Sequence, residues 1–234
     1  MDYAVNEAPI WLEINGRRRV CWTCTPEHIE ELVVGRLLSD AYISATMDLQ
    51  GFERIDEPDG CVGVRVHVPE ENVARVAQER RHEREHGCGL LRYVSCTPEL
   101  LRRERTAVTP GPEVLRAAFR TLFTTTDAAY PDGGMHAAVL WTEAGLQQPV
   151  FDVARHNTID RALGRALRDG IQLSSAGMLL SALVSGAIAA KAARAGVGFL
   201  ASRSIATSLA VRIAEAGRLP VVVRAGARAE RSDP

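Results

Sequence analysis

The chain has 234 residues, of which 46% are hydrophobic and 24% are charged, and its formal net charge is −1. These values are ordinary for a globular protein and give no argument for nucleic acid or membrane binding. The five cysteines are scattered and odd in number, which disfavours a disulfide framework. The N-terminus lacks the apolar core of a signal peptide and no apolar run is long enough to span a bilayer, so we expect a cytoplasmic protein.

The first part of the chain carries the signals of a small α+β unit. Residues 10–24 place two strand-like segments around an Asn-Gly turn at 15–16, the pattern typical of a β-hairpin. A helix is expected to follow, with Thr25 as its N-cap and Pro26 in its first turn. Residues 61–68 alternate in polarity and predict a half-buried strand.

A charge-dense stretch at residues 70–96 ends this N-terminal unit, which we place at residues 1–100. The stretch is expected to be a solvated segment leading into a loop in which Cys88 is bracketed by glycines. A thiol in a flexible loop among cationic side chains is a candidate nucleophile, because such surroundings favour the thiolate. His82 and His86 stand at a spacing that also suits metal ligation, although no fourth ligand is evident.

The second part, residues 101–234, alternates strands with helices. A helix is expected from about residue 112 to 123, followed by a turn-rich stretch at 124–134. The three successive strand–helix units further on imply right-handed crossovers and a mainly parallel sheet, so the fold class is α/β. Strands are expected near 136–142, 148–153, 177–182, 197–201 and 219–224, and helices near 157–168, 185–195 and 205–216.

Polar side chains gather where these strands meet their helices. His136 begins a strand after two glycines, and Arg155, His156 and Asn157 stand between a strand and a helix. Ligand sites in open α/β folds form at such junctions, where helix N-terminal amides and strand-end side chains converge. The alternative roles are structural: Asn157 can cap the helix, and His136 can be an ordinary packed histidine.

The next junctions repeat this pattern. Ser202, Arg203 and Thr207 follow one strand, and Arg224 ends the last predicted strand. Their hydroxyls can be helix caps or contacts to phosphate and ribose. Arginine pairs with phosphate through two parallel hydrogen bonds, so Arg155, Arg203 and Arg224 would suit an anionic ligand. We expect these side chains to converge at one edge of the sheet.

At these residues the chain resembles the FdhD family, the formate dehydrogenase accessory sulfurtransferases. The resemblance is collinear from about residue 6 to residue 224, and its most specific segment is the Arg-His-Asn stretch with its flanking aspartates. The matching segments are the hairpin and the first helix up to Gly35, the Cys88 loop, and residues 135–138, 152–160, 191–196 and 202–211.

The resemblance implies a cytidine-deaminase-like three-layer α/β sandwich beside the small N-terminal unit, and a homodimer. It implies that Cys88 carries persulfide sulfur from a cysteine desulfurase to the bis-guanine-dinucleotide form of the molybdenum cofactor. The client would be a formate dehydrogenase or a related molybdenum or tungsten enzyme. The guanine nucleotide, for which GDP would serve as a mimic, would contact the last strand and its continuation at Val222, Val223, Arg224, Ala225, Gly226 and Ala227.

The chain departs from the family pattern at several points. The family loop commonly has a second cysteine where this chain has Leu91, a usual Ser-Gly-Arg is replaced at 181–183, and a usual glycine is Ala154. The alternative function is therefore a non-enzymatic chaperone that binds the cofactor or a guanine nucleotide without transferring sulfur. Zinc-dependent deamination is excluded because no cysteine follows Cys96, so no bound zinc is expected.

Overall fold

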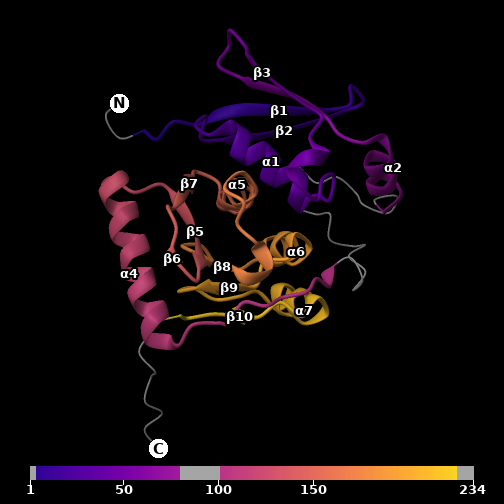
Figure 1. The fold of residues 1–234 in the computed structure, drawn as a ribbon. Helices are drawn as coiled ribbons and strands as arrows, with labels where there is room; N and C mark the ends of the chain where they lie inside the picture. The colour runs from indigo at the N-terminus through magenta and orange to yellow at the C-terminus, as the bar shows by residue number, and fades with distance from the viewer. Residues whose placement is uncertain (1–3, 80–100, 226–234) are drawn as a thin grey trace, which may run out of the picture.

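The computed structural model describes residues 4–79 and 101–225, which form two β-sheets connected by packed helices (Figure 1). In the first sheet, β1 pairs antiparallel with β2 and parallel with β4, and β3 pairs antiparallel with β4. Helix α1 (Ile29–Ser39) packs against this sheet. The strands follow the order β2 (Arg18–Cys24), β1 (Ala8–Ile14), β4 (Val62–His67) and β3 (Gly51–Asp56).

The predicted hairpin is confirmed as β1 and β2, and the strand predicted at 61–68 is confirmed as β4. At the turn, Asn15 and Gly16 take positive φ angles of 51° and 68°, which these two residue types tolerate better than most. Asn15 also fixes the turn to the end of β4. Its Nδ2 donates to the Val68 carbonyl at 2.9 Å, and its Oδ1 accepts from the Val68 N–H at 2.9 Å.

The first helix begins later than the sequence predicts, and Thr25 is not its N-cap. The helix begins at Ile29, and the residue at the N-cap position, His28, has a φ of 47°. Thr25 has other partners: its Oγ1 accepts from the Val153 N–H at 3.2 Å, and the buried Arg161 guanidinium donates to the backbone carbonyls of Thr25 and Glu27. Because these two carbonyls accept from Arg161, the first helical hydrogen bond goes to the His28 carbonyl instead.

Two further elements are not foreseen in the sequence analysis, namely strand β3 and helix α2 (Glu70–Glu79). Helix α2 occupies the start of the stretch expected to be solvated. It forms because Val73 and Val76 repeat at helical spacing and pack on the core, with Val76 only 1% exposed. Arg75 donates to the Ala41 carbonyl at 2.6 Å and ties α2 to the end of α1. The charged side chains within Glu70–Glu79 therefore belong to a helix, and the rest of the stretch lies outside the described residues.

The second sheet has six strands and is mixed, which corrects the expectation of a mainly parallel sheet. Strands β8, β9 and β10 are parallel, as predicted. Strand β5 is antiparallel to β6, β7 and β8. The two-residue turn at 143–144 reverses the chain, so β6 and β7 both run back along β5. The crossover through α5 (Arg155–Arg168) then gives β8 the same direction as β7, which is again antiparallel to β5. The strands are β5 (His136–Thr142), β6 (Gly145–Leu146), β7 (Val150–Asp152), β8 (Gly177–Leu180), β9 (Phe199–Ser202) and β10 (Val221–Val222).

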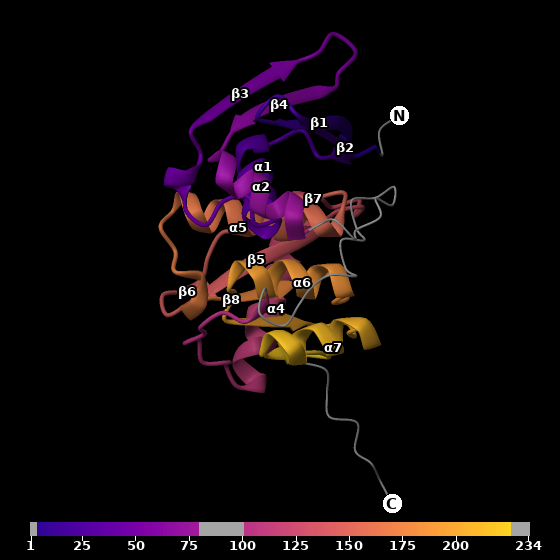
Figure 2. The same ribbon diagram turned by 90° about the vertical axis from the view of Figure 1, so that its right-hand side faces the viewer.

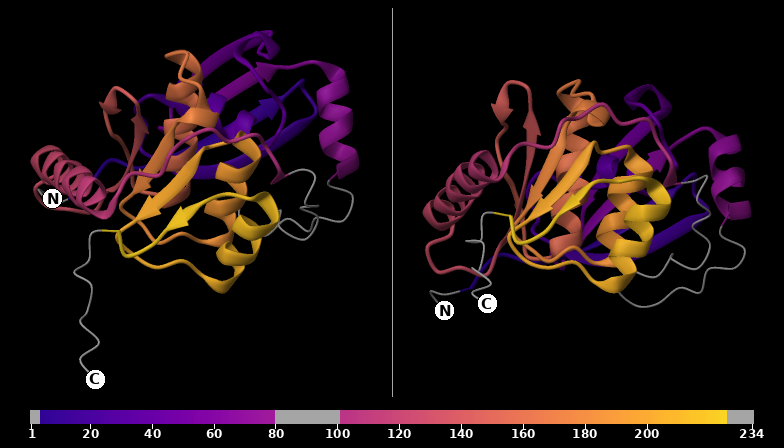
Figure 3. Two further views of the ribbon diagram at one scale, coloured as in Figure 1. Left: turned by 60° about the horizontal axis from the view of Figure 1, so that its bottom comes forward. Right: turned by 90° about the horizontal axis from the view of Figure 1, so that it is seen from below.

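Helices cover both faces of this sheet, with α4 on one face and α5, α6 and α7 on the other (Figures 1 and 3). Helix α4 continues into the stretch predicted to be turn-rich. It can do so because the Thr126 hydroxyl donates to the Leu122 carbonyl at 2.7 Å, which satisfies the buried hydroxyl inside the helix. The helices are α4 (Pro112–Ala129), α5 (Arg155–Arg168), α6 (Gly186–Ala195) and α7 (Ser208–Gly217), with 3-10 turns η1 (Thr46–Asp48) and η2 (Leu173–Ser175).

The two sheets are joined where α1 crosses α5. A Cβ atom on Gly35 would overlap the carbonyl oxygen of Asp160, and one on Gly164 would overlap the carbonyl oxygen of Glu31. Glycine at both positions therefore lets the two helix backbones touch. Figure 2 shows α1 between the N-terminal sheet and α5.

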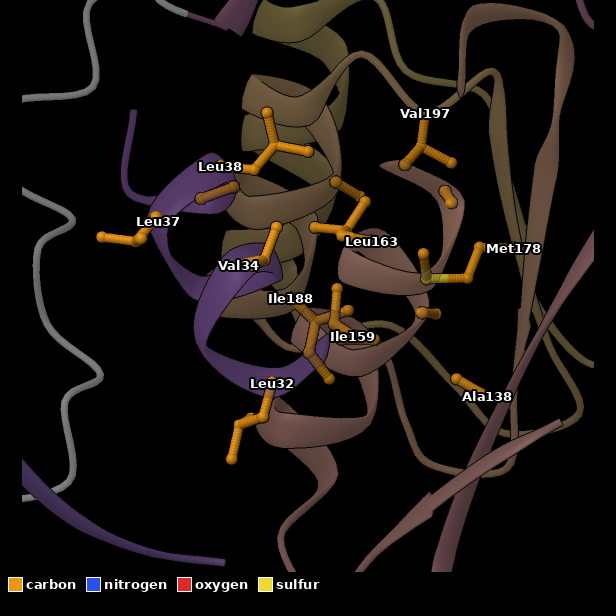
Figure 4. Close-up of a cluster of buried hydrophobic side chains, with 14 of the residues drawn as sticks. Leu32, Val34, Leu37, Leu38, Ala138, Ile159, Leu163, Met178, Ile188 and Val197 are labelled. Carbon is orange, nitrogen blue, oxygen red and sulfur yellow. The ribbon is translucent and has the colours of Figure 1, made fainter. Parts of the chain in front are cut away.

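The larger of two hydrophobic clusters among the described residues runs through this crossing (Figure 4). It includes Leu32 and Val34 of α1, Ile159 and Leu163 of α5, and Ile188 of α6. The boundary expected near residue 100 falls outside the described residues, so it stays a prediction. Within 4–79 and 101–225, no helix is both long and apolar enough to cross a membrane.

The chain after residue 100 passes over the C-terminal ends of α6 and α7. Arg105 donates to the carbonyls of Ala193 at 3.1 Å, Val197 at 2.9 Å and Gly217 at 2.8 Å. Carbonyls at a helix C-terminus lack donors within the helix, and a cation is favourable there. Leu101 packs on Gly217 beside this contact. One guanidinium therefore holds the ends of both helices.

Candidate functional site

The strand ends and helix starts singled out in the sequence share one edge of the six-stranded sheet. His136 pairs opposite Asp152, Ala138 opposite Leu180, and Leu180 opposite Ser202. Strands β7, β8, β9 and β10 therefore end at the edge where β5 begins, and α5, α6 and α7 all start there. We call this the carboxyl edge. Three helix N-termini give it unpaired N–H groups and a positive potential that favours anions.

Three basic side chains, those of His136, Arg155 and His156, come together at the start of β5 and α5. The Nε of Arg155 is buried and has no hydrogen-bond partner among the described residues. His156 Nε2 lies 3.4 Å from the Oγ of Ser185. Ser185 also caps α6, because its hydroxyl accepts from the Ile188 N–H at 3.4 Å. The start of α5 is thus linked to the start of α6.

Both histidines of this group are held neutral near neutral pH. Burial, together with repulsion from the like charges of Lys191, Arg155, Arg36 and His136, lowers the pKa of His156 to about 3. Burial also lowers the pKa of His136, with a second contribution from Arg155. In the free protein these rings are therefore hydrogen-bonding groups without charge.

The cations near His156 belong to a buried network that links α1, α5 and α6. Lys191 Nζ lies 2.7 Å from both carboxylate oxygens of Asp160 and 2.9 Å from Ser39 Oγ. Arg36 Nε lies 2.7 Å from Asp40 Oδ2. Each of these carboxylates is thus paired with its own cation. The network joins the N-terminal helix to the helices that begin at the carboxyl edge.

Asn157 lies inside the protein, away from the open side of the edge. Its Nδ2 donates to the Thr23 carbonyl and to Asp152 Oδ1, each at 2.9 Å. Asp152 is also bonded to Arg161 Nε at 2.8 Å. The cap of α5 is Ala154 without a side-chain bond, so Asn157 is not a cap. Both of its amide hydrogens are used, and the side chain positions the β7–α5 junction.

The hydroxyls of Ser202 and Thr207 shape the loops along the edge. Ser202 Oγ donates to the Ala182 carbonyl at 2.8 Å and accepts from the Ser204 N–H at 3.0 Å. Thr207 caps α7, its Oγ1 accepting from the Ala210 N–H at 3.1 Å. The structure therefore gives Thr207 the capping role that the sequence analysis left open.

The outer end of the edge carries two exposed arginines. The guanidinium carbon of Arg203 lies 5.2 Å from the ring centroid of Phe123 on α4. Arg224 follows β10 with a φ of 52°, and its N–H donates to the Ser204 carbonyl at 2.9 Å. Of the other predicted site residues, Val222, Val223 and Ala225 flank Arg224, whereas Cys88, Gly226 and Ala227 lie outside the described residues.

The carboxyl edge has the chemistry of an anion site. It combines helix N-termini with arginines, and the unpartnered Arg155 Nε is a buried donor that an anionic oxygen would satisfy. Within the part of the chain that the structure describes, no three His, Cys, Asp or Glu side chains are grouped as a metal site requires. The arrangement suits a phosphate-bearing ligand.

Sequence reasoning missed two of the cations near His156. Lys191 stands out as the chain's single lysine, but its partners Ser39 and Asp160 are 152 and 31 residues away in the sequence. Arg36 gives no signal at all, because an arginine on a helix is usually exposed. Only the crossing of α1 over α5 places both near the carboxyl edge.

Known proteins are similar to this chain over nearly its whole length. The model of the FdhD/NarQ family matches residues 5–231. The sulfur carrier protein FdhD of Bacillus subtilis is 32% identical over 219 residues, covering 92% of this chain and 81% of that protein. The protein of the same name from Cupriavidus necator is 30% identical over 243 residues, covering 100% of this chain and 83% of that protein.

A solved structure has a similar fold. It is the crystal structure of a putative formate dehydrogenase accessory protein from Desulfotalea psychrophila, which superposes with a TM-score of 0.68. The alignment covers 94% of this chain and 82% of that one at 19% sequence identity, so the likeness concerns the fold alone.

Proposed function

This chain belongs to the FdhD/NarQ family, and on that premise we propose that it is a sulfur carrier for a formate dehydrogenase or a related molybdenum or tungsten enzyme. It would take persulfide sulfur from a cysteine desulfurase and pass it to the bis-guanine-dinucleotide form of the molybdenum cofactor. The curated relatives named sulfur carrier proteins support the first half of this proposal. The observation that supports the second half is the buried, unpartnered Arg155 Nε at an edge where three helices begin.

The sulfur-carrying group in this proposal is Cys88. Its thiolate attacks the outer sulfur of the desulfurase persulfide, a new S–S bond forms on Cys88, and the desulfurase cysteine leaves as a thiolate. This exchange needs no oxidant or reductant. Release of the persulfide's outer sulfur from Cys88 as sulfide breaks the S–S bond and requires two electrons. We propose that a thiol reductant supplies them. One cysteine suffices to carry the persulfide, so Leu91 in place of a second loop cysteine does not prevent the first step.

The length of the chain allows Cys88 to serve the carboxyl edge. Leu101 packs on Gly217 at the C-terminal end of α7, and the ten residues of α7 set that end about 15 Å from the edge. The segment from Cys88 to Leu101 can span up to about 40 Å when extended. The chain is therefore long enough for the thiol to reach a ligand bound at the edge.

The cofactor is the substrate of this protein, and we propose that its guanine nucleotide binds along the carboxyl edge. The phosphates would satisfy Arg155 and the N-termini of α5 and α6. Arg203 and Arg224 would add charge at the outer end. The nucleotide would run along the continuation of β10, where Val223 is exposed.

Mass spectrometry of the intact protein tests the sulfur transfer. After incubation with a cysteine desulfurase and cysteine, the protein should gain the mass of one sulfur atom, and Cys88→Ala should abolish the gain. Cys21→Ala is the matched control, because Cys21 is a free, exposed thiol. Cys24 should not react, since burial raises its pKa to about 12. Sulfur carried by Cys21 instead of Cys88 would refute the assignment.

The runner-up function is a chaperone that binds the cofactor without transferring sulfur, which the missing second loop cysteine favours. The two functions differ in the activity of the client enzyme. A sulfur carrier requires Cys88, so cells that express only Cys88→Ala should yield an inactive client. A chaperone does not require the thiol, so full client activity with Cys88→Ala, together with nucleotide binding, would establish the second function.

A further inference from the structure

The neutral imidazole of His156 lies at the carboxyl edge, with its Nε2 3.4 Å from the hydroxyl of Ser185, the N-cap of α6. Basic groups on four elements act on this ring through their charge. They are Arg155 on α5, Lys191 on α6, Arg36 on α1 and His136 on β5.

The carboxylates in this region are already neutralised by other partners. Asp160 is bonded by Lys191, Asp40 by Arg36, and Asp152 by Arg161. Among the described residues, neither Arg155 nor His156 has a carboxylate partner, and the Arg155 Nε has no partner of any kind. Arg155 therefore carries a positive charge that no carboxylate among the described residues offsets and that a bound anion would offset.

We propose that binding of a diphosphate group at the carboxyl edge is coupled to protonation of His156, so that the nucleotide is held more tightly in mildly acidic solution. This inference rests on the proposed function, because it takes the phosphates of the nucleotide as the anion. Without the anion, burial and the surrounding cations keep the pKa of His156 at about 3.

The coupling follows from electrostatics and thermodynamic linkage. An anion near a titrating group favours its charged form and raises its pKa, so the bound phosphates draw a proton onto the ring of His156. The effect is reciprocal, so the proton strengthens phosphate binding by the same factor. The Ser185 hydroxyl, 3.4 Å from Nε2, can form a hydrogen bond with either protonation state of the His156 ring. It donates to the ring nitrogen when the imidazole is neutral and accepts from it when the nitrogen carries a proton.

Titration calorimetry with GDP tests the coupling. The GDP affinity of the native protein is compared with that of His156→Asn between about pH 7 and about pH 5. When binding is linked to the uptake of one proton, the affinity can change by up to about tenfold per pH unit. We expect the ratio of the two affinities to rise by about tenfold or more over this range. The ionisation of GDP itself cancels in the ratio. His67→Asn is the matched control, because His67 is an exposed histidine on β4. The ratio of the native affinity to the His67→Asn affinity should not change with pH.

A second measurement needs no variant. Calorimetry at about pH 6 in two buffers with different ionisation enthalpies gives the number of protons taken up on binding, which should be greater than zero after correction for GDP. Binding of GDP with no proton uptake and with a constant affinity ratio would overturn the coupling and leave the proposed function intact. No binding of GDP at any pH would instead refute the nucleotide site of the proposed function, and the coupling with it.

Discussion

Of the predicted site residues, Arg155 should contribute most to the affinity for the nucleotide. Its buried Nε lacks a partner in the free protein, and a hydrogen bond between charged groups contributes about 1.5–3 kcal/mol. We therefore expect Arg155→Ala to weaken GDP binding by about 10- to 150-fold in calorimetry. Arg17→Ala is the control, since Arg17 is an exposed hairpin residue paired with Glu70. An unchanged affinity in Arg155→Ala would remove this residue from the site.

His156 also makes the stability of the fold depend on pH. Its pKa is about 3 in the folded protein but returns to about 6.5 in the unfolded chain. As the pH falls below about 6.5, the unfolded state binds a proton that the folded state excludes, which costs up to about 1.4 kcal/mol per pH unit. In urea unfolding between about pH 7 and about pH 5, His156→Asn should therefore lose less stability than the native protein. Equal losses would contradict the depressed pKa.

The sequence predicts some site residues well because they stand next to strand ends in the chain. Arg155, His156 and His136 fall into this class, since a strand–helix junction can be recognised locally. The role of Asn157 could not be foreseen, because its partner Thr23 is 134 residues away. The same holds for Arg36, whose place near His156 depends on packing between distant helices.

The crossing of α1 and α5 depends on its two glycines. A methyl group on Gly35 would overlap the Asp160 carbonyl, so the helices would have to separate. We expect Gly35→Ala to lower the free energy of unfolding by about 1–3 kcal/mol, the usual cost of overpacking. In Gly111→Ala, the added methyl group meets open space at the N-cap of α4, and the cost should stay below about 1 kcal/mol. Urea unfolding measures the free energy of unfolding of both variants. Equal values would show that α1 and α5 can shift apart to accommodate the added methyl group without a loss of stability.

Elements with a local signal could be predicted, and those set by distant contacts could not. The hairpin, β4 and the parallel strands β8 to β10 have alternating or apolar patterns bounded by turns or helices. The start of α1 was misplaced because Arg161 binds the preceding carbonyls from another part of the chain. The direction of β5 was missed because a two-residue turn at residues 143–144 reverses the chain before the crossovers begin.

The shared core predicts that the two halves of the molecule depend on each other. Fragments 1–79 and 101–234, made separately, would expose the apolar side chains of α1 and α5 around Leu32 and Leu163. We expect each fragment alone to aggregate, and the two together to form a folded complex that copurifies through a tag on one of them. Circular dichroism checks the fold. A monomeric, folded fragment 101–234 would show that α5 does not need α1.

Arg105 gives the molecule a mechanical property. Helices α6 and α7 are short rods of ten residues each, too short to bend appreciably, and one guanidinium fastens both at the end away from the carboxyl edge. The chain that enters at Leu101 is therefore anchored on the same two helices whose other ends lie at the carboxyl edge, about 15 Å away along α7.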